Sequence, residues 1–273
     1  MSEHAPEPDP KEIIGGTFSA ASSSYDEVIA FFAPFGRALA AAADLQPGER
    51  VLDVACGRGA SLFPALDAVG ETGSLLGVDL SHGMIHRLSA DLALRGVTNA
   101  EAVVGDAESL DLRDASFDAI LAGFLIFFAP DPRQVLAELL RVVRPGGRVA
   151  LSIFDGPPAF AWLADVVKEL VGDQPARPSD EFNKASVLEP ALVDAGFGTP
   201  VGTDLTVRFV FASVDEVERW QRSHGGRILL DHLDDLQLAR YRGLITERLQ
   251  DHRVDDGFEL VQRARMVVAH RPD

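Results

Sequence analysis

Short apolar runs alternate with amphipathic stretches between residues 50 and 154. The apolar runs are five to seven residues long, which is typical of buried strands, and they cover 51–55, 75–79, 100–104, 117–122 and 148–154. Three of the intervening segments repeat apolar residues at helical spacing, which predicts helices over 61–69, 83–95 and 132–143. Strands that alternate with helices build βαβ units, so the pattern predicts a doubly wound, Rossmann-like α/β sheet with parallel strands.

The pattern changes after residue 155. Helical spacing predicts helices over 160–170, 184–195, 214–222 and 228–250. Strands are predicted over 201–211 and 258–269. The segment 213–257 therefore interrupts two strands, and we expect it to form a helical insertion that covers one end of the sheet as a lid.

The first residues differ from the rest. Residues 1–12 are polar and contain three prolines, and we expect 1–20 to be disordered and to carry no secretory signal. Apolar residues then recur at helical spacing over 28–39, where Pro34 divides the pattern into two N-terminal helices and lies in the first turn of the second. Residues 21–273 are expected to form a single domain.

Composition narrows the possible partners of the 273-residue chain. The formal net charge is −17 and no two Lys or Arg residues are adjacent, which disfavours a nucleic-acid substrate. No apolar run is long enough to cross a bilayer, so we expect no membrane partner. The single cysteine, Cys56, excludes an intramolecular disulfide, and no cysteine cluster indicates a metal site. These features predict a cytoplasmic protein, either a monomer or a homodimer.

Residues 51–59, VLDVACGRG, carry the first chemical motif. A strand, a glycine-rich turn and a helix open many nucleotide-binding folds, because glycine lets a ligand reach the backbone. The dinucleotide pattern GxGxxG is absent, since Ala55 and Cys56 stand in its place. Asp53 ends the strand with a carboxylate, which suits a cationic ligand better than a pyrophosphate. An NAD(P)-dependent dehydrogenase is therefore disfavoured.

The segment resembles motif I of class I S-adenosylmethionine-dependent methyltransferases, with Ala55 at the position of the family's first glycine. Further motifs of that family follow in order: GVDLSHGM at 77–84, GDAESL at 105–110, FDAI at 117–120 and RVVRPGG at 141–147. The resemblance covers residues 45–155, which would form the cofactor-binding core. Within the family, the chain is similar to the small-molecule enzymes that methylate ubiquinone and menaquinone precursors. It implies a seven-stranded, mostly parallel sheet with an antiparallel last strand.

The resemblance also implies roles for single residues. Asp79 would hold both ribose hydroxyls, Met84 would pack on the adenine, and Asp106 would accept from the adenine amine. Tyr25 would lie over the methionine end of the cofactor, and Cys56 is a small packing residue rather than a nucleophile. The full set expected to bind S-adenosyl-L-methionine, and S-adenosyl-L-homocysteine as product, is Tyr25, Asp53, Ala55, Cys56, Gly57, Gly59, Asp79, Leu80, Met84, Gly105, Asp106, Ala107, Gly123 and Phe124.

Candidate acceptor residues lie after the fourth strand and in the insertion. The apolar segment 124–128 predicts a hydrophobic or aromatic small-molecule acceptor, with Phe127 and Phe128 in contact with it or simply in the core. In the insertion, Trp220 and Arg227 are candidate acceptor contacts, and Trp220 alternatively packs within the lid. His224 and, less favoured, His232 are candidate bases, because a histidine near neutral pKa deprotonates a hydroxyl; alternatively both are surface residues of the lid.

The predicted activity is methyl transfer by in-line displacement to an oxygen, nitrogen or carbon atom of a small metabolite, with no metal. The alternative is a protein that binds the same cofactor and catalyses a step other than methylation, such as a cyclisation or a pericyclic reaction of specialised metabolism, because the fold does not settle the function.

Overall fold

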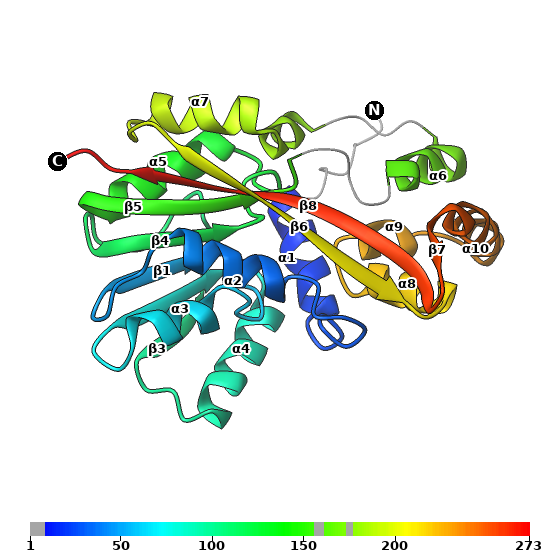
Figure 1. Ribbon diagram of the computed structural model, residues 1–273, viewed down its shortest axis with the longest axis horizontal. Coiled ribbons are helices and arrows are strands. Elements are labelled where there is room, and N and C mark those ends of the chain that lie inside the picture. The colour runs from blue at the N-terminus through cyan, green and yellow to red at the C-terminus, as the bar shows by residue number, and fades with distance from the viewer. Residues whose placement is uncertain (1–8, 156–160, 173–176) are drawn as a thin grey trace, which may run out of the picture.

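The computed structural model describes residues 9–155, 161–172 and 177–273, and a single sheet forms its centre (Figure 1). The strand order is β3-β2-β1-β4-β5-β8-β6. The strands are β1 Arg50–Val54, β2 Ser74–Asp79, β3 Ala100–Val104, β4 Phe117–Gly123, β5 Val143–Ile153, β6 Val201–Phe211 and β8 Gly257–His270. The first five pair in parallel, whereas β8 runs antiparallel to both β5 and β6. The predicted seven-stranded sheet is confirmed, and the two-residue strand β7 (Arg253–Val254) adds to its edge at β8.

Helices cover both faces of the sheet, which is why its central strands are mainly apolar. Val51, Leu52 and Ile120 are fully buried, as is Leu151 on β5. The covering helices are α2 Ala33–Ala42, α3 Leu62–Val69, α4 His82–Leu94, α5 Pro132–Val142 and α7 Ala185–Ala195. Helix α2 packs on α3, and α5 packs on α7 (Figure 1).

The N-terminal segment is a helix, so the expected disorder of 1–20 is wrong from Pro10 onward; residues 1–8 lie outside the described part. Helix α1 spans Pro10–Ala21, starts with a proline in its first turn and is capped by Asp9, whose carboxylate accepts from the Lys11 N–H at 2.9 Å. It packs on α4, and this tertiary contact stabilises a helix that its sequence alone does not favour.

The segment between α1 and α2 is not the predicted first helix. Residues 29–32 lack helical structure, whereas Pro34 lies in the first turn of α2 as predicted. The apolar residues of this segment are explained by packing and not by a helix, since Phe31 is buried against Phe35 and Phe209.

The lid consists of several helices. The predicted insertion 213–257 contains α8 Val214–Arg222, α9 Arg227–Leu230, α10 Asp235–Leu249 and η2 Gln250–His252. Helix α6 Ala161–Val171 lies outside the insertion in sequence but packs against α10, so we count it with the lid, whereas η1 Pro178–Asn183 packs on α7. The single helix predicted over 228–250 is wrong, because Asp234 caps a new helix by exchanging hydrogen bonds with Gln237.

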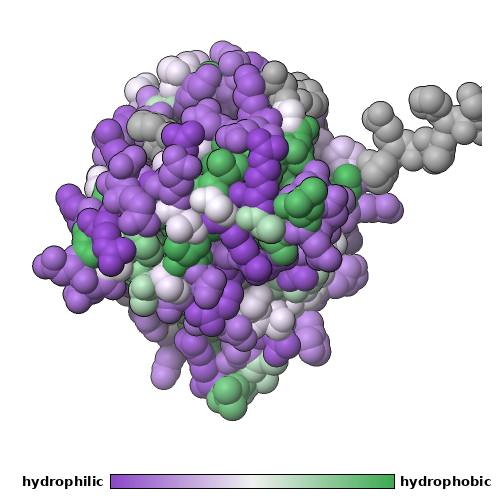
Figure 2. Space-filling model, turned by 90° about the vertical axis from the view of Figure 1, so that its right-hand side faces the viewer, coloured by the Kyte–Doolittle hydropathy of each residue, from purple (hydrophilic) through white to green (hydrophobic). Residues whose placement is uncertain are grey.

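A small core of its own stabilises this lid, with α10 and α6 in contact around Val166, Leu230, Tyr241 and Ile245. Figure 2 shows that the face on this side of the molecule is mainly hydrophilic, with apolar residues in small separate groups. Within the described residues, no helix combines the length and apolar character that crossing a bilayer requires.

Candidate functional site

A cavity of about 440 Å³ opens at the carboxyl ends of the parallel strands, where the strand order reverses between β1 and β4. Three loops line one part, which we name the motif end; it comprises 55–58 after β1, Asp79, Leu80 and Met84 after β2, and 105–108 after β3. Aromatic side chains line the other part, which we name the aromatic end. The two parts are one continuous space.

The loop after β1 exposes its backbone to the cavity. Ala55, Gly57 and Gly59 have φ of 57°, 51° and 85°, a conformation that favours glycine. A Cβ atom on Gly57 would meet no protein atom within 4 Å, so a ligand can reach the backbone there. A Cβ on Gly59 would lie 2.9 Å from Phe63 and Leu88, and Gly59 does not line the cavity. Close packing therefore requires glycine at 59, which corrects the expected cofactor contact there, whereas the cavity is open at Gly57.

Asp79 joins two of the loops. Its Oδ2 accepts from the Gly57 N–H at 2.9 Å, and its Oδ1 accepts from the Ser81 N–H at 2.8 Å. Burial raises the pKa of this carboxyl, and the two backbone donors oppose that shift by favouring the charged form. A half-buried carboxylate that lines the cavity is suited to accept hydrogen bonds from a vicinal diol.

Asp53 lies behind the cavity wall. It is fully buried, and it is not among the described residues that line the cavity. Its Oδ2 accepts from the hydroxyl of Ser61, a lining residue, at 2.8 Å. Burial raises the pKa of Asp53 to about 7, against the opposing hydrogen bond, and its Oδ1 has no partner among the described residues. Ser61 therefore lies between Asp53 and the cavity, which corrects the expectation of direct contact.

The loop after β3 brings Asp106 into the cavity, where Lys11 of α1 holds it. The Lys11 ammonium lies 2.6 Å from Asp106 Oδ2 and 2.6 Å from a carboxylate oxygen of Glu108. Asp106 Oδ1 accepts from the Glu108 N–H at 2.9 Å. Gly105 and Ala107 also line the cavity here, as expected, and buried Met84 lies in the same wall.

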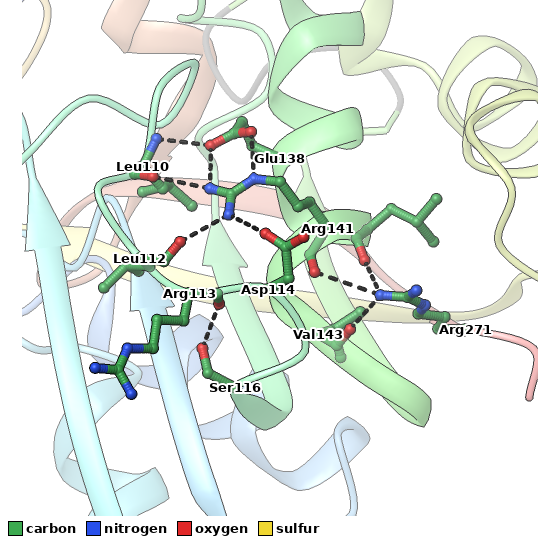
Figure 3. A network of polar contacts seen from close by, with 10 residues as sticks. Leu110, Leu112, Arg113, Asp114, Ser116, Glu138, Arg141, Val143 and Arg271 are labelled. Atoms are coloured by element: carbon green, nitrogen blue, oxygen red, sulfur yellow. Dashed lines mark hydrogen bonds and ion pairs between the residues drawn. The ribbon is translucent and has the colours of Figure 1, made fainter.

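A network around Arg141 of α5 fastens this loop to the fold (Figure 3). The Arg141 guanidinium donates to the carbonyls of Leu110 and Leu112 at 2.8 and 2.7 Å, and to Glu138 and Asp114. Glu138 Oε2 also accepts from the Leu110 N–H at 2.8 Å. The guanidinium holds the pKa of Glu138 below its usual range, so this carboxylate stays charged. Charge-assisted hydrogen bonds from Arg141 and Glu138 therefore position the loop.

The aromatic end draws its side chains from segments far apart in the sequence. Its aromatic lining consists of Phe18, Tyr25, Phe31, Phe32, Phe124, Phe128, Phe154 and Trp220. The Tyr25 and Phe32 rings stack at 5.6 Å between centroids, and Phe124 stacks on Phe154 at 4.0 Å. Phe124 has a φ of 53°, and its N–H donates to the Ser152 hydroxyl at 3.1 Å, which fixes the start of this wall.

Several predicted residues of this end are in place and others are not. Gly123, Tyr25, Phe124, Phe128 and Trp220 line the cavity as predicted. Phe127 is buried in the core beside Phe154 and is not among the described lining residues, so its predicted acceptor contact is wrong.

His224 presents one unpartnered nitrogen at the aromatic end. The residue is 7% exposed, and its Nδ1 lies 2.8 Å from the Trp220 carbonyl and 2.9 Å from the Ser223 hydroxyl. Because the carbonyl only accepts, Nδ1 carries the proton, and Nε2 is left as an acceptor. Nε2 is buried without a partner among the described residues. Burial lowers the pKa of His224 to about 4, although the carbonyl opposes this shift.

The two other polar candidates of the lid lie elsewhere. His232 is exposed, its Nδ1 donates to the Ile228 carbonyl at 2.7 Å, and it does not line the cavity. Arg227 is also outside the lining; it pairs with Asp231 at 2.7 Å and donates to the Ala20 carbonyl at 3.3 Å. Arg227 therefore joins the lid to α1, and both expectations of a direct role are corrected.

Sequence reasoning missed part of the lining, including residues that no motif marks. These residues are Lys11, Ile14, Phe18, Phe31, Phe32, Ser152, Phe154, Asn183 and Gln262. The α1 residues were detectable, because Asp9-Pro10 is a helix-start pattern and 11, 14 and 18 share a helical face. Gln262 in β8 had no such mark, since its place depends on the pairing of the last strands.

The residues of the motif end fit S-adenosylmethionine. Asp79 and Asp106 supply acceptors for hydroxyl and amine groups, Gly57 gives access to the backbone, and the orphaned Asp53 Oδ1 suits a nearby positive charge. Among the described residues there is no group of three or more side chains arranged to hold a metal ion.

Comparisons with known proteins agree with this fit. The family model described as a methyltransferase domain matches residues 51–147. The chain is 38% identical over 143 residues to the aklanonic acid methyltransferase DauC of Streptomyces sp. (strain C5), covering 52% of this chain and 65% of DauC. It is 36% identical over 144 residues to a nocamycin O-methyltransferase of Saccharothrix syringae, covering 52% of this chain and 51% of that protein. This chain thus matches only half to two thirds of the length of these two relatives.

A longer match extends past the motifs. A demethylmenaquinone methyltransferase of Oceanobacillus iheyensis is 30% identical over 196 residues, which are 70% of this chain and 79% of that protein.

Solved structures share the fold. A phosphoethanolamine N-methyltransferase 2 of Haemonchus contortus in complex with S-adenosyl-L-methionine has a TM-score of 0.61 at 15% identity, over 98% of this chain and 61% of that one. The [4+2]-cyclase SpnF has a TM-score of 0.53 at 19% identity, over 88% of this chain and 80% of that one. The chain belongs to the class I S-adenosylmethionine-dependent methyltransferase family.

Proposed function

We propose that this protein transfers the methyl group of S-adenosylmethionine to a small, largely apolar or aromatic acceptor. The observation that carries the proposal is the continuous cavity, which joins the polar motif end to the aromatic end. A donor bound at the first and an acceptor bound at the second share one space, as in-line transfer requires. The names of DauC and of nocamycin O-methyltransferase support a small-molecule acceptor, and the second supports oxygen as the atom methylated.

The chain contributes orientation and exclusion of water. When bound, the cofactor supplies an electrophilic methyl group on a sulfonium, and the bond from methyl carbon to sulfur breaks as the bond to the acceptor atom forms. Charge disperses in such a displacement, so a dry apolar wall favours it. Tyr25, Phe32 and Phe124 provide that wall close to the loop after β1, and their ring contacts limit their freedom.

His224, and not His232, is our candidate for the base. An acceptor hydroxyl at the aromatic end would donate to Nε2, which lacks another partner among the described residues, and its proton would pass to this nitrogen during transfer. Burial lowers the pKa of His224 to about 4, which corrects the near-neutral value expected from the sequence. The ring is neutral near pH 7 and can take the proton as methyl transfer makes the acceptor oxygen acidic. The exposed position of His232 removes it from this role.

Incubation with methyl-labelled S-adenosylmethionine and extracts of small aromatic metabolites tests the proposal. We expect label to move into an organic-soluble product whose mass shows one added methyl group. We expect no transfer with the Asp79→Ala variant, which lacks the carboxylate at the motif end. Conversion of a metabolite without label, in a reaction that still depends on the cofactor, would instead support the non-methylating alternative.

A further inference from the structure

One face of helix α1 is directed at the motif end. Lys11, Ile14 and Phe18 all line the cavity, and their spacing of three and four residues places them on one side of the helix. Gly15 and Ser19 continue this side and contact the turn before α4 instead. The helix therefore forms a further wall of the motif end, in addition to the loops after β1, β2 and β3.

This wall is docked closely and is not a loose tail. Ser19 Oγ lies 2.9 Å from Ser81 Oγ and accepts from the Gly83 N–H at 3.2 Å. A Cβ atom on Gly83 would lie 2.7 Å from the Ser19 carbonyl oxygen, so only glycine permits this approach. At the far end of α1, Arg58 donates to the Ser22 carbonyl at 2.9 Å. The position of Lys11 at the start of α1 is thus set by the contacts along the helix.

Lys11 and Asp106 together present a donor and an acceptor to the same part of the cavity. Their side chains are 28% and 31% exposed, and their charged atoms lie 2.6 Å apart. Asp106 Oδ1 is held by the backbone of Glu108, which fixes the carboxylate. An ammonium group has three donors, and Asp106 and Glu108 use two of them, so one is left for a ligand.

We propose that Lys11 is a specificity-determining residue of the adenine subsite, where it donates to a ring nitrogen while Asp106 accepts from the exocyclic amine. In adenine, the amine is flanked on both sides by ring nitrogens that accept hydrogen bonds, N1 and N7. A neighbouring acceptor and donor match either edge, as the side-chain amide of asparagine or glutamine does when it contacts adenine in nucleic acids. This inference rests on the proposed cofactor, and it extends the adenine contact to a helix outside the family motifs.

Calorimetric titration with three ligands tests this assignment: S-adenosylhomocysteine and its 1-deaza and 7-deaza analogues, in which a CH group replaces one ring nitrogen. In the wild-type protein, we expect one analogue to bind about tenfold more weakly than the parent ligand, because a charge-assisted hydrogen bond is lost. In Lys11→Met, we expect the parent ligand to weaken by a similar factor and the difference between parent and analogue to vanish.

Two further variants separate recognition from docking of the helix. Lys11→Arg keeps a cationic donor and should retain the preference for the parent ligand. Lys184→Met removes an exposed lysine, paired at 3.5 Å with Glu181, and should change nothing. If Lys11→Met weakens all three ligands by one common factor, or none of them, the proposal is overturned and Lys11 only fastens α1. If the wild-type protein binds none of the three, the proposed function itself fails.

Discussion

The motif end of the cavity is built from loops that follow three neighbouring parallel strands, whereas the aromatic end draws on segments spread from Phe18 to Gln262. At the motif end, polar atoms are already held by the protein: both Asp79 oxygens accept backbone N–H groups. At the aromatic end, ring contacts dominate, and the His224 Nε2 is left without a described partner. The polar groups of the motif end are thus preorganised for a ligand, whereas the aromatic end is an apolar space with one free acceptor among its described residues, the His224 Nε2.

The two ends also differ in how freely their residues can be exchanged. Hydrogen bonds between loops at the motif end leave little freedom to change one residue alone. The aromatic end is supplied by α1, the segment before α2, β4, the lid and β8, which can vary separately. Changes at the two ends should therefore have separable effects on cofactor affinity and on turnover.

Asp79→Ala should have the largest effect. We expect the affinity for S-adenosylhomocysteine to fall roughly 100-fold or more, because the carboxylate that accepts from the Gly57 N–H, and that we expect to accept from the ribose, is removed. Titration calorimetry measures this loss. Asp67→Ala, at an exposed position of α3, is the matched control and should bind like the wild type. An unchanged affinity in Asp79→Ala would contradict the assignment of the motif end.

His224→Ala should affect the other end alone. We expect kcat to fall on the order of 100-fold, as is usual for loss of a general base, with no change in S-adenosylhomocysteine affinity. His232→Ala should leave both quantities unchanged, because His232 is exposed and outside the cavity. Full turnover in His224→Ala would show that His224 does not act as the base.

The pH profile of kcat sharpens the same assignment. Burial lowers the pKa of His224 to about 4, so Nε2 stays unprotonated as the pH falls through 6.5. Within the pH range where the protein stays folded, we expect the contribution of His224 to kcat to be level down to about pH 5. A fall in kcat centred near pH 6.5 that is absent from His224→Ala would show an ordinary, solvated histidine instead.

Gly57→Ala should have an intermediate effect, confined to the motif end. Gly57 and Gly96 have φ of 51° and 66°, and a Cβ at either would meet no protein atom within 4 Å. Both alanine variants should therefore lose a similar free energy of unfolding, about 1–2 kcal/mol from the left-handed backbone. Only Gly57 lines the cavity, so only Gly57→Ala should weaken S-adenosylhomocysteine binding. We expect a loss of about tenfold in affinity, because one contact between the ligand and the backbone is lost. Equal binding by the two variants would count against ligand access at Gly57.

Asp53→Asn should have the smallest effect on ligands and a clear effect on stability. The folded protein holds the pKa of Asp53 at about 7, above the ordinary value of 3.8 for this carboxyl, so between these pH values the folded state binds more protons than the unfolded state. The contribution of Asp53 to the free energy of unfolding therefore falls as the pH rises, by at most about 1.4 kcal/mol per pH unit.

Denaturant unfolding of the wild type and of Asp53→Asn between pH 5 and 8 isolates this contribution, since other groups cancel in the difference. We expect the variant to gain stability relative to the wild type as the pH rises towards 7. The amide can still accept from the Ser61 hydroxyl, so the packing is kept. A difference that does not vary with pH would mean that Asp53 is not held protonated.

The sequence predicted most of the sheet and of the motif end, because each motif follows one strand and short-range patterns place it. Asp79, Asp106 and Gly57 lie where the motifs imply. The error at Asp53 has a physical cause: a strand-end carboxylate and a buried one look alike in sequence, and only the fold shows the Ser61 hydroxyl between Asp53 and the cavity.

The aromatic end was harder to predict, because its residues meet only through long-range packing. Phe31 and Phe32 fit a helical pattern yet serve as cavity wall, and Phe127 and Phe128 differ in place although they are neighbours. Helix α1 was missed because its polar composition and Gly15-Gly16 disfavour an isolated helix, and docking on α4 outweighs that cost.

A crystal structure of the protein grown with S-adenosylhomocysteine tests the central claim most directly, namely that one cavity holds donor and acceptor at its two ends. We expect the ribose hydroxyls on Asp79, the adenine beside Asp106 and the sulfur directed towards the aromatic end near Tyr25 and His224. A ligand bound elsewhere, or one whose sulfur points away from the aromatic end, would contradict the account.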